Sequence, residues 1–358
     1  MEARTLIMDA TIFLILVQKA VVAAAVYALL ALAFVLVFTV TRIIFVPQGE
    51  LVSFAALTLV ALESHQVPQS VWLLLGLGLI AFLFESYAAL RKRQLRRIAV
   101  AALMYLIVPL AISGSAVWAS GHDLPIAVLG LVSVLVIVPI GPMLYRVVFQ
   151  GLVDASVLML LVVAVAVHFV LNGGGLILFG PEGARSKPFL DGVVNLGPTT
   201  LSLQNLAIVA AALALAATLA VLFGRTLYGK LLRATAMHRM GARLVGIDPI
   251  QSGLIVFGLT ALIGATTGVL MSPNTTMYYD TGFLIGLKGL IAGAVGGLIS
   301  YPLAAVGAIL VALLEVFGAF KASAFKEIIV FTLIVPVLIW RSVFRGKGET
   351  HSAEEDGI

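Results

Sequence analysis

Glu50 and Gln48 are polar residues beside apolar segments, and their side chains could serve either structure or transport. They follow Pro47, which suits the first turn of a helix, where a carboxylate is stabilised by the positive end of the helix dipole. The alternative is that both side chains line a polar path, because an ionisable group near a membrane span is by default a functional candidate. The sequence leaves both interpretations open.

Lys288 and Glu315 are a second candidate constellation, because they lie in consecutive apolar segments. Lys288 is near the start of residues 282–297, and Glu315 is near the end of residues 303–320. A fold of the chain at residues 300–302 would bring both to a similar depth, where two unpaired charges would each cost several kcal/mol. We therefore expect an ion pair, which is either structural or part of a gate that responds to substrate.

The remaining chemistry-bearing residues do not form the patterns that enzymes use. Residues 224–231 come close to a phosphate-binding loop, but Leu231 stands where Ser or Thr is required and no strand precedes it. The five histidines have no metal-ligand spacing, the chain has no cysteine, and His168 is interpreted as a packed histidine. We expect a non-enzymatic protein that binds no metal or cofactor of its own.

Composition indicates a polytopic membrane protein built from helices. Hydrophobic residues make up 61% of the 358 residues and charged residues 11%, whereas soluble domains carry roughly 25% charged residues. Apolar runs of spanning length recur, and we expect an all-α fold of about ten transmembrane helices, including a broken hairpin at residues 300–302. The net charge of +5 lies in short loops beside these helices and does not indicate nucleic-acid binding.

Charge in the loops predicts the orientation of the chain. Basic clusters at residues 91–97, 224–252 and 341–347 should face the cytoplasm, which places the N-terminus outside and the C-terminus inside. Residues 172–203 lack this inward charge bias and should lie outside. This outer segment is either a contact for an external partner or a connector.

The chain divides into three expected parts. Residues 1–19 should form an interfacial segment, residues 20–345 the transmembrane domain, and residues 346–358 a disordered tail. Within the domain, small residues at a four-residue spacing should lie on one face of a helix and let a neighbouring helix approach closely. These residues are Gly289, Gly293 and Gly297.

The longest basic interruption, residues 224–252, carries the clearest local signals. Residues 229–244 contain no proline and several alanines, leucines and methionines, which predicts one short helix. Gly246 is placed to end that helix, and Asp248 with the proline after it is typical of the cap of the next helix. The segment either docks a soluble partner or only sets the topology.

Three stretches together resemble the Liv-type permeases, the membrane subunits of bacterial ABC importers for branched-chain and other hydrophobic amino acids. The first stretch is similar to the family through Phe45, Gly49 and Glu50. The second matches the family's cytoplasmic pattern through Gly229, Arg233, Ala234, Ala236, Ala242, Gly246 and Ile247. The third matches its C-terminal hairpin through Gly282, Phe283, Lys288, Gly296, Gly297, Pro302 and Glu315.

The resemblance implies a permease subunit in the bacterial inner membrane that translocates branched-chain amino acids or related small amphipathic solutes. A second permease subunit, identical or homologous, two cytoplasmic ATP-binding subunits that carry ATP and Mg²⁺, and a periplasmic solute-binding protein would complete the importer within the membrane lipid. Residues 172–203 would then meet the binding protein. The alternative is an ion-coupled secondary transporter, for which Glu50, Lys288 and Glu315 are the candidate ionisable groups.

The resemblance also implies a coupling segment that sits on the ATP-binding subunits. Its residues would be Gly229, Arg233, Ala234, His238, Arg239, Ala242, Gly246, Ile247 and Asp248. Two features depart from the family pattern. His238 and Arg239 stand where the family often carries an acid, and residues 66–124 look like an insertion that adds about two spans.

Overall fold

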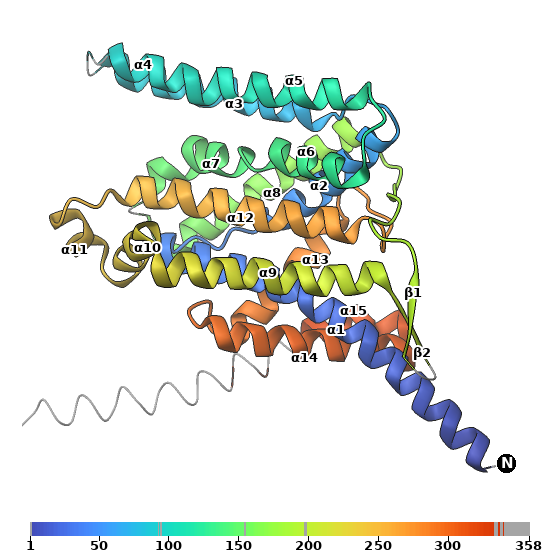
Figure 1. Ribbon diagram of the computed structural model, residues 1–358. Coiled ribbons are helices and arrows are strands. Elements are labelled where there is room, and N and C mark those ends of the chain that lie inside the picture. The colour runs from blue at the N-terminus through green and yellow to red at the C-terminus, as the bar shows by residue number, and fades with distance from the viewer. Residues whose placement is uncertain are drawn as a thin grey trace, which may run out of the picture.

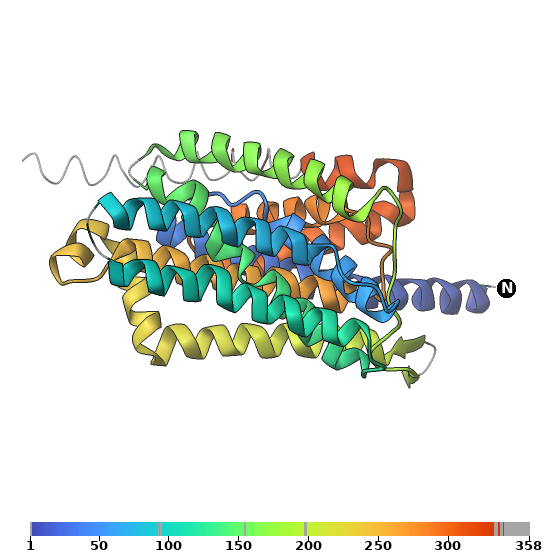
Figure 2. The same cartoon turned by 90° about the horizontal axis from the view of Figure 1, so that it is seen from above.

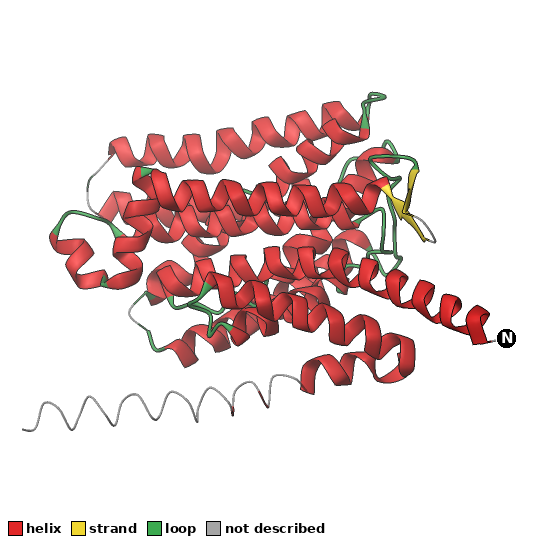
Figure 3. Ribbon diagram, turned by 60° about the horizontal axis from the view of Figure 1, so that its bottom comes forward, coloured by secondary structure: helices red, strands yellow, loops and turns green. Residues whose placement is uncertain are grey.

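The computed structural model describes residues 2–91, 93, 95–153, 155–196, 199–332, 336 and 339. Figure 3 shows that this part of the chain is mostly helical, with one small hairpin of strands. The helices are α1 (Glu2–Thr41), α2 (Gln48–Glu63), α3 (Ser70–Arg91), α4 (Leu95–Ala102), α5 (Val108–Ser120), α6 (Ile126–Ile137), α7 (Ile140–Leu144), α8 (Val157–Phe179), α9 (Leu203–Arg225), α10 (Leu227–Met237), α11 (Arg239–Leu244), α12 (Pro249–Met271), α13 (Thr281–Val295), α14 (Tyr301–Lys321) and α15 (Lys326–Thr332). Shorter turns are π-helical at Leu103–Ile107 and Tyr145–Phe149 and 3₁₀ at Gln150–Leu152 and Ser323–Phe325. The strands β1 (Val193–Leu196) and β2 (Thr199–Ser202) pair antiparallel, with Val193 opposite Ser202.

Eight helical segments among the described residues are long and apolar enough to cross a membrane. They are Thr11–Thr41, Ser70–Arg91, Arg96–Ser120, Ile126–Leu152, Val157–Phe179, Leu203–Arg225, Pro249–Met271 and Tyr301–Lys321. Two shorter helices, α2 with 16 residues and α13 with 15, lie among them. The predicted all-α polytopic fold is confirmed, and the described residues contain eight spans of full length where the sequence predicts about ten.

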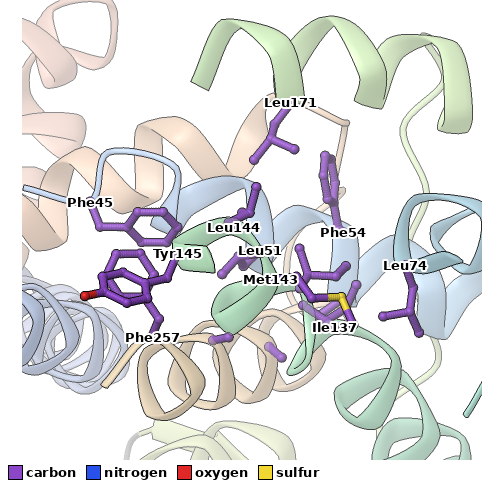
Figure 4. Packing of buried hydrophobic residues seen from close by; sticks show 14 of the residues in the cluster. Phe45, Leu51, Phe54, Leu74, Ile137, Met143, Leu144, Tyr145, Leu171 and Phe257 are labelled. Atoms are coloured by element: carbon purple, nitrogen blue, oxygen red, sulfur yellow. The ribbon is translucent and has the colours of Figure 1, made fainter. Parts of the chain in front are cut away.

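The centre of the bundle is built around α12 and α13, each of which contacts both α1 and α2 (Figure 1). α2 is buried on every face from Gln48 to Leu59, because other helices enclose it. Figure 4 shows an aromatic part of this core, where the Phe257 ring centroid lies 4.8 Å from that of Phe45 and 4.9 Å from that of Tyr145. The loop before α2 and the π-helical turn after α7 therefore meet on α12.

Residues 66–124, predicted as an insertion, form a helical hairpin along one side of the bundle (Figure 1, Figure 2). One arm is α3, and the other runs from α4 through a π-helical turn into α5. The hairpin contacts α2, α6 and α7, and the Glu85 carboxylate pairs with the Arg146 guanidinium after α7. Exposed apolar side chains such as Trp72, Leu83 and Leu110 suit contact with lipid.

Two predicted boundaries fall inside helices. α1 runs without a break from Glu2 to Thr41, because no glycine or proline interrupts it, so the helix does not end at residue 20, and the interfacial position of residues 1–19 stays a prediction. α8 continues to Phe179, so the predicted outer segment 172–203 begins as helix. Its glycines remain helical partly because Gly175 packs on the Phe54 ring, where a Cβ would come within 2.9 Å. Only the later part of the segment forms the loop and the β1–β2 hairpin.

The two ends of the bundle differ in content (Figure 1). α10 and α11 lie at one end, together with the connection between α3 and α4, and the β1–β2 hairpin and the N-terminus of α1 lie at the other. The predicted basic clusters at residues 91–97 and 224–252 therefore share one end. The cluster at residues 341–347 and the predicted tail, residues 346–358, lie outside the described residues.

Candidate functional site

Gly229 makes the sharp turn between α9 and α10 possible. A Cβ at this position would lie 2.2 Å from the Leu222 carbonyl oxygen, so only glycine fits where α10 crosses the end of α9. The Thr226 hydroxyl caps α10 by accepting a hydrogen bond from the Gly229 N–H at 3.1 Å. The first of the predicted coupling residues thus determines the shape of the segment.

His238 divides the predicted helix over residues 229–244 into two, α10 and α11. Its backbone is extended, and its Nδ1 accepts a hydrogen bond from the Gly241 N–H at 2.8 Å. An imidazole that caps a new helix start in this way replaces the backbone bonds of a continuous helix. The prediction of one helix is wrong, because its residue propensities favour helix and the competing side-chain cap is not visible in them.

Gly246 and Asp248 end α11 and begin α12, as the sequence predicts. Gly246 has a φ of +84°, and the Ile247 N–H donates to the Ala242 carbonyl at 2.9 Å across it. Asp248 Oδ1 accepts from the Ile250 N–H at 2.9 Å and caps α12. Asp248 is exposed. Two further predicted coupling residues, Ala234 and Ile247, are half-buried, and a third, Arg239, begins α11.

α10 and α11 have one face against the bundle and one face open. Leu232 and Ala242 are buried, and the Thr235 hydroxyl lies 3.0 Å from the Ser252 hydroxyl, which connects α10 to the start of α12. Arg233 is exposed. The exposed apolar side chains near it in the chain are Leu227, Tyr228, Leu231, Met237, Leu244 and Val245. Large apolar side chains around an arginine are typical of a protein-docking surface.

Glu50 is fully buried, and its partner is His168. Glu50 Oε1 lies 2.5 Å from His168 Nδ1, and the imidazole stacks on the Phe283 ring with centroids 4.0 Å apart. The contact joins α2, α8 and α13 inside the bundle. His168 is packed, as predicted, and it is also the partner of one oxygen of the Glu50 carboxylate.

Gln48 faces a different helix from Glu50. Its amide nitrogen donates to the Thr260 carbonyl of α12 at 3.0 Å. Gly264, one turn further along α12, leaves room for this amide, since a Cβ there would lie 2.8 Å from Gln48 Nε2. Gln48 and Glu50, which the sequence suggests could line one polar path, therefore face different helices.

Gly49 and Gly282 bring the backbones of α2 and α13 into direct contact. A Cβ at Gly49 would lie 2.3 Å from the Gly282 carbonyl oxygen, and a Cβ at Gly282 would lie 2.0 Å from the Gly49 carbonyl oxygen. The Gly282 N–H also donates to Ser53 Oγ at 2.7 Å. This crossing sets the position of both Glu50 and Phe283.

The predicted glycine face of α13 is partly correct. A Cβ at Gly289 would lie 2.5 Å from Leu30 Cβ, and Gly293 lies close to Ala31, so both positions face α1. Gly297 does not belong to this face, because it follows the end of α13 with a φ of +68° and makes the turn toward α14. A four-residue spacing cannot distinguish a packing glycine from one just beyond the helix end.

Lys288 and Glu315 do meet, and two more side chains join them. Lys288 Nζ lies 2.6 Å from Glu315 Oε1 and 3.1 Å from Glu327 Oε1, and the Tyr27 hydroxyl donates to Glu315 Oε2. Lys288 is buried and the two carboxylates are partly exposed. One ammonium therefore bridges α13, α14 and α15, and α1 supplies the phenol.

This cluster borders an open pocket of about 790 Å³ at the end of the bundle opposite α10. Tyr27 and Glu315 form part of its wall. Its lining also includes three cationic side chains, Lys19, Arg185 and Lys326. Arg185 is held in place because its Nε donates to the Pro273 carbonyl at 2.6 Å.

Comparison with known proteins identifies the family. The sequence model of the family described as "branched-chain amino acid transport system / permease component" matches residues 16–338. The chain belongs to this permease family. No solved structure matches it.

Two curated relatives show how far the similarity of this permease chain extends. The high-affinity branched-chain amino acid transport system permease protein BraD of Pseudomonas aeruginosa is 32% identical over 136 residues, 35% of this chain and 43% of the relative. The permease protein LivH of the same description, from Escherichia coli, is 28% identical over 131 residues, 35% of this chain and 41% of the relative. The chain thus spans less than half the length of these curated relatives.

Residues of the first and third family-like stretches meet in this permease chain. Gly49 crosses Gly282, and His168 connects Glu50 to Phe283. The second stretch, α10 and α11, lies at one end of the bundle and reaches this centre through α12, which contacts α2. The motifs therefore form one connected unit.

Sequence reasoning missed several of the paired residues. His168, Tyr27 and Glu327 complete the two buried clusters, and Glu85 pairs with Arg146. An ionisable residue within an apolar segment needs a partner, so Glu85 could have been found from the sequence. Within the described ranges, no group of three or more His, Cys, Asp or Glu side chains could hold a metal ion.

Proposed function

We propose that this chain is the translocation subunit of an ATP-driven importer for branched-chain amino acids or related small amphipathic solutes. The observation that carries the proposal is the family match over residues 16–338. Two relatives named for branched-chain amino acid transport support this class of solute.

In the proposed importer, α10 and α11 sit on an ATP-binding subunit that hydrolyses ATP. The exposed apolar side chains around Arg233 support this docking, and the contact between Thr235 and Ser252 would pass movement of α10 to α12. α12 packs on both α1 and α2, so a displacement there reaches the centre of the bundle. ATP, bound by the partner subunits, can shift the equilibrium between two conformations of the importer only if it binds those conformations with different affinity.

The remaining partners follow from the two ends of the bundle. We assign α10 and α11 to the cytoplasm, because the basic residues before α4 and along residues 224–252 lie at that end. The opposite end carries the β1–β2 hairpin, whose exposed Val193 and Val194 would meet a solute-binding protein. A second permease subunit, identical or homologous, and a second ATP-binding subunit would complete the assembly in the bacterial inner membrane.

Purification of the tagged chain from its native membrane in mild detergent tests the proposal. Mass spectrometry of the eluate should find an ATP-binding subunit in stoichiometric amount, and reconstituted vesicles should take up leucine only when both ATP and the solute-binding protein are supplied. A stable preparation without an ATP-binding subunit, active in uptake driven by a proton or sodium gradient, would replace the importer by a secondary transporter.

A further inference from the structure

A groove lies between α1, α9, α10 and the start of α14 at the α10 end of the bundle. Its volume is about 450 Å³, and its lining is mainly apolar. The apolar residues that the argument uses are Val40, Phe223, Leu232, Met237, Ile299 and Tyr301. The groove therefore suits a hydrocarbon chain better than a polar solute.

A second cavity of about 180 Å³ lies next to this groove, along α1 and α9. Phe223 and Tyr301 line both cavities, and their ring centroids are 6.2 Å apart. The second cavity reaches Leu32, eight residues before Val40 on α1, which corresponds to about 12 Å along a helix. The two neighbouring cavities together extend from the end of the bundle into the depth of the spans, with Phe223 and Tyr301 between them.

Two guanidinium groups, those of Arg42 and Arg233, belong to the lining of the wider part. Neither forms an ion pair with any residue that the structure describes. The lining contains no Asp or Glu that could bind the ammonium group of an amino acid. The charge of the groove is therefore complementary to an anion.

The backbone of Arg42 adopts a conformation that is unfavourable for a residue with a side chain. Its φ is +61°, a conformation that favours glycine over any residue with a Cβ. Replacement of Arg42 by glycine would therefore remove the charge and relieve the backbone in one change. Arg93 offers a matched control, because it has a φ of +52°, is exposed and lies between α3 and α4, outside the groove.

We propose that this groove binds an anionic phospholipid from the membrane leaflet at the α10 end, with its phosphate on Arg42 and Arg233 and one acyl chain along α1 and α9. The apolar lining and the two arginines together favour this ligand. A free phosphate would leave the apolar part of the groove unfilled, and a lipid without net charge would leave the positive charge of the two arginines unbalanced. The bound lipid would touch Leu232, Arg233 and Met237 of α10 and hold that helix against α1. The proposal goes beyond transport and stands whether or not the importer assignment is correct.

Native mass spectrometry of the purified full chain, with any subunits that accompany it, measures the binding. The probes are dioleoyl phosphatidylglycerol, dioleoyl phosphatidylethanolamine and glycerol 3-phosphate. We expect phosphatidylglycerol to bind most tightly, Arg42→Gly to weaken it about tenfold or more, and Arg93→Gly to leave it unchanged. Ala216→Leu, which narrows the inner cavity, should weaken both phospholipids, and unfolding temperatures measured without lipid would show that each variant is folded.

Several results would overturn the proposal. Equal binding of both phospholipids, or equal losses in Arg42→Gly and Arg93→Gly, would show that no anionic headgroup is held in the groove. Binding of glycerol 3-phosphate as tight as that of phosphatidylglycerol, with no effect of Ala216→Leu, would indicate a phosphate site alone. Loss of self-association in Ala216→Leu without loss of lipid would assign the groove to a second copy of the chain.

Discussion

Glu50 and His168 are in contact inside the bundle, where 0% of the Glu50 side chain and 7% of the His168 side chain are exposed. Each satisfies a polar atom of the other, so removal of one leaves a buried polar group without its partner, at a cost of about 1–3 kcal/mol. We expect Glu50→Ala to lower the thermal unfolding temperature in detergent and Glu50→Gln to lower it less, because an amide oxygen can still accept from the imidazole.

The double variant Glu50→Ala with His168→Leu checks this account. Its loss of stability should be smaller than the sum of the two single losses, because the second change removes the group that the first left unsatisfied. A strictly additive result would mean that the two side chains are stabilised by other contacts.

Lys288 pairs with two carboxylates, so its loss should destabilise the chain more than the loss of either carboxylate. Lys288→Ala would leave Glu315 and Glu327 facing each other, whereas Glu315→Ala would leave Lys288 paired with Glu327. Lys288→Ala should therefore destabilise the chain more than Glu315→Ala. The two changes should couple by about 0.5–3 kcal/mol in a double-mutant cycle of thermal unfolding. A coupling of zero would mean that the pair contributes nothing to the fold.

At the scale of elements, α2 and α13 depend on a glycine at each side of their crossing. Gly282→Ala would place a methyl group 2.0 Å from the Gly49 carbonyl oxygen, and overpacking of this kind costs about 1–3 kcal/mol or more. We expect a lower unfolding temperature and a lower yield of folded protein. Gly173→Ala in α8 is the control, because nothing lies within 4 Å of its Cβ and alanine favours helix. Equal decreases in unfolding temperature in both variants would mean that the close contact between α2 and α13 is not what makes Gly282 necessary.

The segment formed by α10 and α11 predicts a separation of transport from stability. Arg233 is exposed, so Arg233→Ala should leave the unfolding temperature measured without lipid unchanged. If the segment docks on an ATP-binding subunit, solute-dependent ATP hydrolysis should fall several-fold, since an arginine in such an interface contributes about 1–2 kcal/mol or more. Arg93 is also exposed but lies between α3 and α4, outside this segment, so Arg93→Ala should change neither quantity. Unchanged solute-dependent ATP hydrolysis in Arg233→Ala would mean that the ATP-binding subunit docks on another surface.

Sequence patterns and packing contributed differently to these elements. Gly246 and Asp248 could be predicted, because helix stops and caps depend on residues close in sequence. Glu50 and His168 could not, since their contact spans 118 residues and depends on the crossing of α2 with α13. Lys288 and Glu315 lie between these cases: one hairpin brings them together, while Tyr27 comes from a distant helix.

For the whole molecule, composition was sufficient to predict a helical membrane protein, because length and apolarity decide whether a helix can cross a bilayer. Boundaries were less predictable. Glycines 173–175 look like a loop in the sequence but continue α8, where Gly175 packs on the Phe54 ring of α2. Single residues are thus weaker signals inside a bundle than in an exposed segment.

The orientation of the whole chain is open to a direct test, because the sequence contains no cysteine. Single cysteines at Lys230 in α10 and at Val194 in β1 are both exposed and lie at opposite ends of the bundle. Basic residues favour the cytoplasmic side, so a membrane-impermeant maleimide should label Val194→Cys in intact spheroplasts and Lys230→Cys only after permeabilisation. The opposite pattern would place α10 outside, where no cytoplasmic ATP-binding subunit could reach it, and would exclude coupling through this segment.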